Sequence, residues 1–325
     1  MVFYTSKITS LQQNLVQITE GLDCDELFVL SGYVGPGPLQ NLSLVDGIRL
    51  NVIYGLALES ISQLLHEELI RIVSKDKRTK IFYSTTPSHV KIYIWLKKGA
   101  PVYCLNGSAN FTSNGLLKPF REVLSQVPSS QFKSIMEYVS LIQGTSFPIQ
   151  EYEPKVKNTK MIAAEEEVQY NNGMYLTDSL FAARSKINWG HGNAHTNVRD
   201  AYIPISTKDI KRAPNLFPAK TENKGLGYAD NDPIDIVWDD GTIMTGILEG
   251  TQSIAGERFP NKIATYKDKK ILGDYLRLRM GIDPGEFVTE LDFVKYGRNN
   301  IGIKLIGDAT YQFDFSKPST VQPLP

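Results

Sequence analysis

The first half of the chain alternates continuous apolar runs with amphipathic ones. Residues 26–35 and 47–58 are rich in Val, Ile, Leu and Tyr and are bounded by Gly, which predicts two buried strands. Residues 60–76 place Ile, Leu and Val at helical spacing and predict a helix. Residues 80–99 and 100–112 predict two more strands, joined by a Lys-Lys-Gly turn. Strands and helices in alternation indicate an α/β domain, with a sheet flanked by helices.

The second half has little helical periodicity. Short β-like runs, separated by turn signals such as Asp240-Gly241, cover residues 200–206, 233–241, 242–250, 300–307 and 310–316. One helix is expected over residues 269–282, which end near a Gly and are followed by Pro-Gly. Many short strands with one or two helices predict a mainly β, barrel-like domain.

Residues 151–173 differ from both halves because they are polar, charged and poor in large apolar side chains. This composition indicates a linker. We therefore predict a first domain over residues 1–173, which includes the linker, and a second domain over residues 174–325. The alternative is that residues 151–173 form a solvated surface helix of the first domain.

The charge of the chain is balanced overall but segregated in the second half. The whole chain has 35 basic and 35 acidic residues. Residues 184–224 hold eight Lys or Arg and residues 255–280 hold seven, against three acidic residues in each segment. Residues 228–250, between them, hold six acidic residues and no Lys or Arg. The two basic segments predict a phosphate-binding cradle if they face the same way; otherwise they are ordinary solvated faces.

Several protein classes are disfavoured by the sequence. The two cysteines, Cys24 and Cys104, lie in apolar runs and suggest neither a disulfide framework nor a zinc site. The N-terminus lacks the pattern of a signal peptide, and no apolar stretch approaches the ~18 residues of a membrane helix. We expect a cytoplasmic protein without a membrane partner.

The sharpest chemical signal is His89-x-Lys91 followed by Gly107-Ser108-Ala109-Asn110. Side chains two positions apart on a strand point the same way, so two neighbouring strands can direct four polar groups at one point. An imidazole can attack phosphorus and form a phosphohistidine. An ammonium and an amide can hold the non-bridging oxygens of the phosphate, and no metal is then required.

These residues resemble the phospholipase D superfamily, whose signature is HxK followed by GSxN. The resemblance implies that His89 is the nucleophile or acid and that Lys91, Ser108 and Asn110 bind phosphate. It also implies that an acidic residue about a dozen positions after the Asn orients the histidine, and Glu122 stands there. Leu96 departs from the pattern, because many members carry Asp at that position. This departure disfavours a phospholipid-processing role and favours a divergent nuclease branch.

Only one HxK motif is present, whereas catalysis in this superfamily uses two histidines. His66 falls in a helical pattern without a following x-Lys, and His191 and His195 lie in the second half. The resemblance therefore implies a homodimer through the nuclease domain, with the two copies of His89 meeting at the twofold axis.

The second half also resembles a known arrangement. Residues 183–206 combine Asn-Trp-Gly, basic residues, histidines and amides ahead of a strand. With the runs further on, they resemble restriction endonucleases of the NgoFVII/NgoAVII type, in which a phospholipase D-like domain precedes a B3-like DNA-binding domain. The resemblance implies two arms that grip double-stranded DNA, over about residues 184–199 and 251–267. The expected contacts are Arg184, Lys186, Asn188, Trp189, His191, Asn193, Arg199, Gln252, Arg258, Lys262 and Lys267. The alternative is a structural role, in which Trp189 is buried and anchors a loop.

The sequence thus predicts an α/β phospholipase D-like domain and a mainly β, B3-like pseudo-barrel domain. We expect a type II-like restriction endonuclease that needs neither metal nor other cofactor. The chain lacks a GxxxxGK[ST] run, so any ATP use would come from a helicase subunit; a cognate methyltransferase is a further expected partner. Two rival interpretations remain, a catalytically silent DNA-binding protein and a phospholipase D-type lipid enzyme.

Overall fold

The protein divides into two compact units. The computed structural model describes residues 2–5, 9–43, 45–153, 173–175, 197–220 and 231–317. The first unit comprises residues 1–159 with 306–310, and the second comprises residues 160–305 with 311–325. Most of the linker predicted over residues 151–173 lies outside the described residues.

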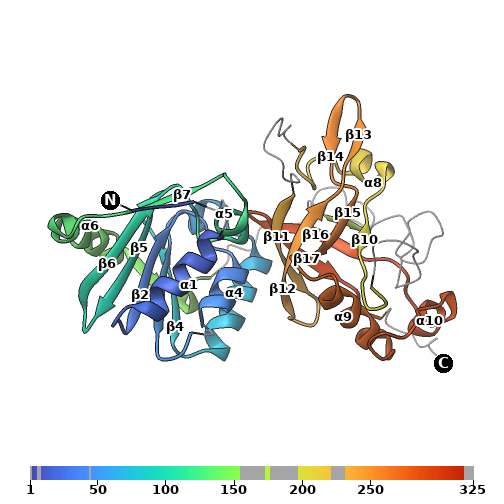
Figure 1. Ribbon diagram of the computed structural model, residues 1–325, viewed down its shortest axis with the longest axis horizontal. Helices are drawn as coiled ribbons and strands as arrows, with labels where there is room; N and C mark the ends of the chain where they lie inside the picture. Colours follow the sequence, from blue (N-terminus) through green and yellow to red (C-terminus); the bar gives the residue numbers. More distant parts are fainter. Residues whose placement is uncertain are drawn as a thin grey trace. The chain divides into compact units, whose positions relative to one another are not determined.

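The first unit is built on an eight-stranded mixed sheet, ordered β1-β7-β6-β5-β2-β3-β4-β8 (Figure 1). Strands β2, β3 and β4 are parallel, and the other pairings are antiparallel. The strands are β1 (Phe3–Thr5), β2 (Glu26–Ser31), β3 (Arg49–Tyr54), β4 (Thr79–Ser84), β5 (Lys91–Lys97), β6 (Ala100–Gly107), β7 (Val123–Gln126) and β8 (Ser146–Pro148). The α/β arrangement predicted from the sequence is confirmed.

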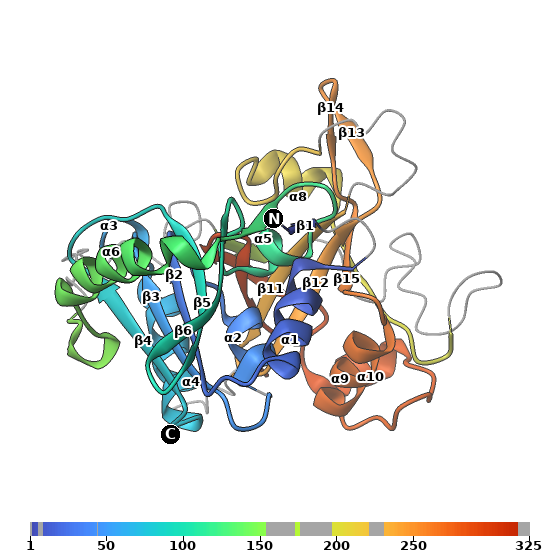
Figure 2. The same cartoon turned by 60° about the vertical axis from the view of Figure 1, so that its left-hand side comes forward.

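Helices cover both faces of this sheet. They are α1 (Leu11–Gly21), α2 (Pro36–Ser43), α3 (Ala57–Ser60), α4 (Gln63–Lys75), α5 (Ser113–Leu117) and α6 (Phe132–Gly144), with 3-10 turns at Ser129–Gln131 and Ile149–Glu151. On one face, Trp95 donates its indole N–H to Thr19 of α1 at 2.8 Å. On the other face, Leu30 and Ile94 belong to an apolar cluster with Val139 of α6 (Figure 2). Successive strand residues therefore feed two separate cores.

The predicted strand over residues 80–99 is wrong in one respect. The structure divides it into β4 and β5, which do not pair with each other in the sheet order. Residues 85–90 join them, and Ser88 donates its main-chain N–H to Gly55 at 3.1 Å. This stretch contains Pro87, which has no N–H to donate to a strand ladder. The helix predicted over residues 60–76 is confirmed by α4, which begins three residues later.

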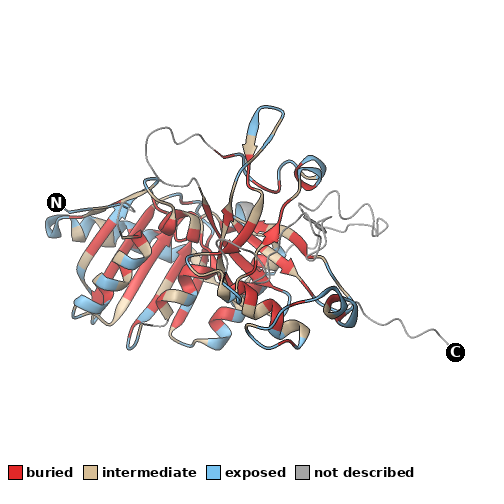
Figure 3. Ribbon diagram, turned by 45° about the vertical axis from the view of Figure 1, so that its right-hand side comes forward, coloured by how far each residue is buried: buried red, intermediate tan, exposed pale blue. Residues whose placement is uncertain are grey.

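The second unit is mainly β, as predicted, and its principal sheet is curled (Figure 1). The strand order is β10-β15-β12-β11-β17-β16-β9, beside a separate hairpin of β13 and β14. The strands are β9 (Gly173–Tyr175), β10 (Ile203–Pro204), β11 (Asp232–Trp238), β12 (Ile243–Glu249), β13 (Gln252–Ile254), β14 (Glu257–Phe259), β15 (Lys262–Thr265), β16 (Gly302–Gly307) and β17 (Thr310–Asp314). Buried residues lie mainly along the strands, and exposed ones on the outer sides of helices and turns (Figure 3).

Three described helices accompany this sheet: α8 (Thr207–Arg212), α9 (Lys270–Met280) and α10 (Glu290–Tyr296). Helix α9 confirms the helix predicted over residues 269–282. It ends at Gly281 in the left-handed conformation (φ 77°), which glycine adopts without strain. The sequence analysis missed α8 and α10, because each is only two turns long or less and shows little periodicity. Among the described residues, no helix is long and apolar enough to cross a membrane.

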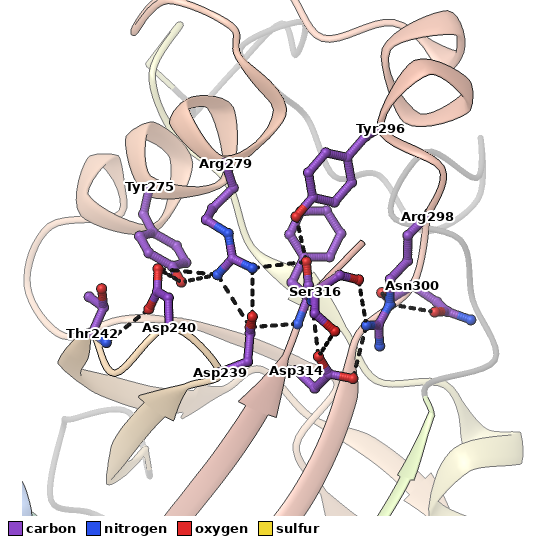
Figure 4. Close-up of polar contacts among 11 residues, drawn as sticks. Asp239, Asp240, Thr242, Tyr275, Arg279, Tyr296, Arg298, Asn300, Asp314 and Ser316 are labelled. Carbon is purple, nitrogen blue, oxygen red and sulfur yellow. Dashed lines mark hydrogen bonds and ion pairs between the residues drawn. The ribbon is translucent and has the colours of Figure 1, made fainter. Parts of the chain in front are cut away.

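An ion-pair network joins α9 to the ends of two strands in the second unit (Figure 4). The Arg279 guanidinium donates to Asp239 at 2.7 Å and to Asp240 at 3.2 Å. Asp239 also accepts the main-chain N–H of Phe315 at 2.9 Å. Arg298 donates to Asp314 at 2.9 Å on the same side of the sheet. These carboxylates are therefore committed to holding the fold.

Candidate active site and DNA-contact residues

Lys91 is the first residue of β5, and His89 lies just before the strand begins. In register, Lys91 stands opposite Ser31, the last residue of β2. The prediction that both motif residues lie on a strand is therefore wrong for His89. The loop after β3 holds the chain there, through the hydrogen bond from Ser88 to Gly55. His89 is consequently presented at the end of the sheet, with an exposed side chain.

The second half of the motif also lies just beyond a strand. β6 ends at Gly107, and Ser108 exchanges two hydrogen bonds with Val123 at the start of β7. In one of them the Ser108 hydroxyl accepts the Val123 N–H at 3.1 Å. A side chain at position 107 would lie 2.0 Å from the Val123 carbonyl oxygen, so the close approach requires glycine. Asn110 follows in the turn toward α5.

His89 and Asn110 meet at Gly32, directly after β2. A Cβ atom on Gly32 would lie 2.6 Å from the His89 Cδ2 atom and 3.5 Å from the Asn110 Oδ1 atom. The main-chain N–H of Tyr33 donates to Asn110 Oδ1 at 3.3 Å. This bond fixes which end of the amide faces the β2 loop and leaves the Nδ2 donors for another acceptor. Residues from the two halves of the motif thus lie together at Gly32.

Lys91 is buried, with only 6% of its surface exposed. Its ammonium donates to the His89 carbonyl oxygen at 2.5 Å, which places the cation next to the histidine backbone. Burial lowers the pKa of Lys91, while the carboxylates of Glu122 and Asp308 act in the opposite direction. A cation held in such surroundings acts more strongly on a phosphate than one in water.

Glu122 lies directly before β7, where its carboxylate is 3.5 Å from the Arg121 Nε atom. Among the described residues it makes no hydrogen bond to His89, so the expected orienting contact is not formed here. Its carboxylate instead influences Lys91. The orienting role of Glu122 stays a prediction.

Three residues near this site were missed by the sequence analysis. Gly32 and Tyr33 follow a buried strand, and their only signal in the sequence is that position. Asp308 belongs to the segment 306–310 of the first unit and accepts a hydrogen bond from Thr112 at 3.5 Å. Nearly 200 residues separate Asp308 from Thr112, and no local pattern predicts such a contact.

The predicted DNA-contact residues fall into two groups. Arg184, Lys186, Asn188, Trp189, His191 and Asn193 lie outside the described residues. The others are described, and three of them have partners within the second unit. Arg199 forms an ion pair with Asp274, and Lys262 lies 3.3 Å from Glu249. Gln252 donates its amide to the carbonyls of Ile205 and Pro260.

Arg258 and Lys267 differ from these three. Within the part of the chain that the structure describes, neither has a carboxylate within ion-pair distance. Arg258 lies on β14, where its guanidinium is 3.5 Å from the Thr251 hydroxyl. The Lys267 ammonium is 5.5 Å from the centre of the Tyr266 ring. Both charges are therefore available to an anionic partner.

No group of three or more His, Cys, Asp or Glu side chains that could hold a metal ion occurs among the described residues. Several of the carboxylates discussed above form ion pairs with Arg or Lys, as Asp239 and Glu249 do.

Two solved structures are similar to part of this chain. NucT from Helicobacter pylori is 16% identical, covers 45% of this chain and 99% of its own, and gives a TM-score of 0.34. Nuc from Salmonella typhimurium, a phospholipase D family member, is 12% identical, covers 44% of this chain and 91% of its own, and gives a TM-score of 0.33. No curated protein matches the chain.

The sequence profiles of one family match almost the whole chain. The NgoFVII restriction endonuclease N-terminal PLD domain matches residues 10–156. The NgoFVII C-terminal B3-like DNA-binding domain matches residues 162–307. The chain belongs to the NgoFVII restriction endonuclease family. The recognition made from the sequence and both predicted fold types are confirmed.

Membership of the NgoFVII family divides the candidate residues between two domains. His89, Lys91, Ser108, Asn110 and Glu122 all fall within the phospholipase D-like domain, which is of the nuclease and phosphodiesterase superfamily. The candidate DNA contacts fall within the B3-like domain. The chain is therefore a phospholipase D-like nuclease with a DNA-binding domain, and DNA is its partner.

Proposed function

We propose that this NgoFVII family member is a type II-like restriction endonuclease that cleaves DNA without a metal ion. The observation that carries this proposal is the convergence of His89 and Asn110 at Gly32, with the buried Lys91 ammonium bonded to the His89 carbonyl. This arrangement places one nucleophile and two kinds of phosphate donor within one small region. Such donors stabilise the charge that develops on the non-bridging oxygens.

The proposed reaction has two displacements. An imidazole nitrogen of His89 forms a bond to phosphorus, the bond from phosphorus to the leaving oxygen breaks, and that oxygen takes a proton from a second imidazole. Water then attacks the phosphohistidine, gives its proton to the second imidazole, and restores His89. Lys91, Asn110 and Ser108 hold the non-bridging oxygens in both steps.

The second imidazole is proposed to be His89 of a second copy of the chain. The other described histidine, His66, is buried and its Nδ1 atom lies 3.0 Å from the Tyr83 hydroxyl, so it serves the core. A homodimer through the nuclease domain would bring two exposed His89 side chains to one phosphate.

Site recognition is proposed for the B3-like domain. Arg258 and Lys267 are the described candidates whose charge has no carboxylate partner, and they lie on or beside the β13–β15 region. We expect Arg199, Gln252 and Lys262 to contribute less, because each already has an internal partner. A helicase subunit that hydrolyses ATP and a cognate methyltransferase are proposed partners of the complete restriction system.

The test is plasmid cleavage in EDTA with the full chain and with His89→Ala. We expect discrete fragments from the wild type and a loss of at least about 10³-fold in the variant. Wild type quenched by denaturation should also carry a phosphoryl adduct that is stable in alkali and labile in acid, as a phosphohistidine is. Thermal unfolding of the variant, expected to match the wild type, serves as the folding control.

Each result decides a different part of the proposal. Metal-dependent cutting that survives His89→Ala would exclude the phosphohistidine mechanism. Specific DNA binding without cleavage, even with a helicase partner and ATP, would favour a catalytically silent DNA-binding protein.

A further inference from the structure

We propose that Tyr33 is a positioning residue for the candidate active site, and that its ring orients the His89 imidazole. This inference rests on the proposed function, because it assigns His89 the role of nucleophile. No hydrogen bond to the His89 ring is made by the residues that the structure describes, and its side chain is exposed. The contact that can limit its rotation is therefore packing against a neighbouring ring.

The aromatic neighbour that supplies this packing is Tyr33. The ring centres of Tyr33 and His89 are 6.0 Å apart, with an interplanar angle of 78°. Edge-to-face pairs at this separation are favourable and depend on the relative orientation of the rings. Gly32 lets the histidine come this close, since a side chain there would strike the His89 Cδ2 atom.

The Tyr33 ring also packs against an aromatic ring of the domain core. It packs edge-to-face on Tyr54 at 6.4 Å, and Tyr54 packs in the same way on Tyr83 at 6.1 Å. Tyr54 and Tyr83 are both buried, and Tyr83 is hydrogen-bonded to His66. A row of rings therefore runs from the core of the nuclease domain to His89, so the position of Tyr33 is set by the fold.

The backbone of Tyr33 is fixed as firmly as its ring. Its carbonyl accepts the Ser31 hydroxyl at 2.7 Å, and the same hydroxyl oxygen accepts the Phe111 N–H at 2.9 Å. Gly35 donates to the Phe111 carbonyl at 2.9 Å. The segments around Tyr33 and Asn110 are thus bonded together, and the Tyr33 N–H holds the Asn110 amide. One residue consequently positions both the nucleophile and a phosphate donor.

The two functions can be separated because only one of them uses the side chain. Tyr33→Phe keeps the ring and removes the hydroxyl, whereas Tyr33→Leu removes the ring; both keep the main-chain N–H to Asn110. Tyr103→Leu is the matched control, because its ring packs on Trp95 and its hydroxyl lies 2.8 Å from Tyr4, apart from His89. The full chain is used throughout, with cleavage measured as kcat and KM.

We expect Tyr33→Leu to lower kcat about 10- to 100-fold with little change in KM, since a misplaced nucleophile slows the chemical step more than binding. Tyr33→Phe and Tyr103→Leu should stay within about threefold of wild type. The direct measurement is the ring-proton spectrum of the histidines, with the His89 signals identified by His89→Ala. The ring current of Tyr33 should shift these signals, and only Tyr33→Leu should remove that shift.

The possible outcomes are distinct. A normal kcat and unchanged His89 signals in Tyr33→Leu would overturn the inference. An equal loss of kcat in Tyr33→Phe would overturn it too, by giving the role to the hydroxyl, and an equal loss in Tyr103→Leu would show general destabilisation. The histidine spectrum does not depend on cleavage. If His89→Ala proved fully active, the proposed function would fail while the spectrum still decided whether the Tyr33 ring packs on the His89 ring.

Discussion

The candidate active site of the nuclease domain and the basic segment 255–280 of the B3-like domain use their charged and polar residues in opposite ways. In the nuclease domain, His89, Lys91 and Asn110 lie at or just beyond strand ends. Among the described residues, the side-chain hydrogen bonds of Lys91 and Asn110 are to main-chain groups rather than to carboxylates. In the B3-like domain, basic residues of the segment 255–280 are largely paired. The pairs are Lys262 and Lys269 with Glu249, Lys270 with Asp268, and Arg279 with Asp239 and Asp240.

This difference shows what charge counted along a sequence can establish. The acidic segment 228–250 supplies Asp239, Asp240 and Glu249 to the basic segment that follows it. Two segments of opposite charge thus neutralise one another through the fold. The cradle predicted from local charge is reduced, among the described residues of that segment, to Arg258 and Lys267. A count of local charge therefore does not establish that the charges remain unpaired in the folded domain.

The largest effect is expected from Lys91→Met. Loss of the buried ammonium should lower cleavage by about 10³-fold, since in the proposed mechanism Lys91 donates to the non-bridging oxygens as charge develops on them. The stability of the nuclease domain should not fall, because the substitution removes a desolvated charge. Cleavage assays and thermal unfolding check this. Lys80→Met, at an exposed position on β4, is the control. Normal cleavage by Lys91→Met would contradict the proposed role of the buried ammonium.

The next effect concerns Arg277, a basic residue of the B3-like domain with a structural role. It is fully buried and donates to the main-chain carbonyls of Val198, Arg199 and Glu286. Arg277→Met should cost about 3–5 kcal/mol of unfolding free energy, because buried acceptors lose their donors. Urea unfolding followed by tryptophan fluorescence measures it. Arg258→Met is the control and should change stability by no more than about 0.5 kcal/mol; equal losses would contradict the contrast.

A smaller effect is expected for DNA binding. Arg258→Ala and Lys267→Ala should each reduce the slope of log affinity against log salt by about 1, as for the loss of one phosphate contact. Arg199→Ala is the matched variant, whose guanidinium is already paired with Asp274. It should change the slope less. DNA affinity measured across a salt series gives these slopes. A larger change in slope for Arg199→Ala than for the other two variants would show that paired cations also reach DNA.

The smallest effect is a shift in pH dependence. In the proposed mechanism Lys91 must be protonated to hold phosphate, so activity is present below its pKa and is lost as the pH rises through it. Burial lowers this pKa and Glu122 opposes the change, so Glu122→Gln should move the alkaline limb of kcat/KM to lower pH. Glu67→Gln, an exposed residue of α4, is the control. A uniform loss of activity at every pH would instead indicate that Glu122 orients His89.

Much of the nuclease domain could be predicted from the sequence. Continuous apolar runs gave β2 and β3, and the spacing of the two motif halves placed Lys91 and Asn110 on neighbouring segments. The sequence did not show that His89 and Asn110 leave their strands, since that depends on contacts with Gly55 and Val123 elsewhere in the chain. Gly32 and Tyr33 were missed for the same reason, because the residues that link them to the site, His89 and Asn110, are more than 50 positions away in the sequence.

In the B3-like domain, strands with alternating burial such as β12 could be predicted from the sequence. The burial and the partners of each basic side chain could not. Arg277, in α9, and Arg258, in β14, are both basic residues of the segment 255–280. One is fully buried among carbonyls and the other is half-exposed on a hairpin. That distinction arises only when α9 packs on the chain around Arg199, where Gly273 lies too close for a side chain.

The edges of the nuclease sheet limit how two copies could associate. Its outermost strands, β1 and β8, have three residues each, and β8 ends in Pro148, which has no N–H to donate. Short edges of this kind offer little backbone to an added strand, and proteins use them to resist edge-to-edge aggregation. A dimer of this enzyme should therefore form through side chains and loops near His89 rather than by extending the sheet.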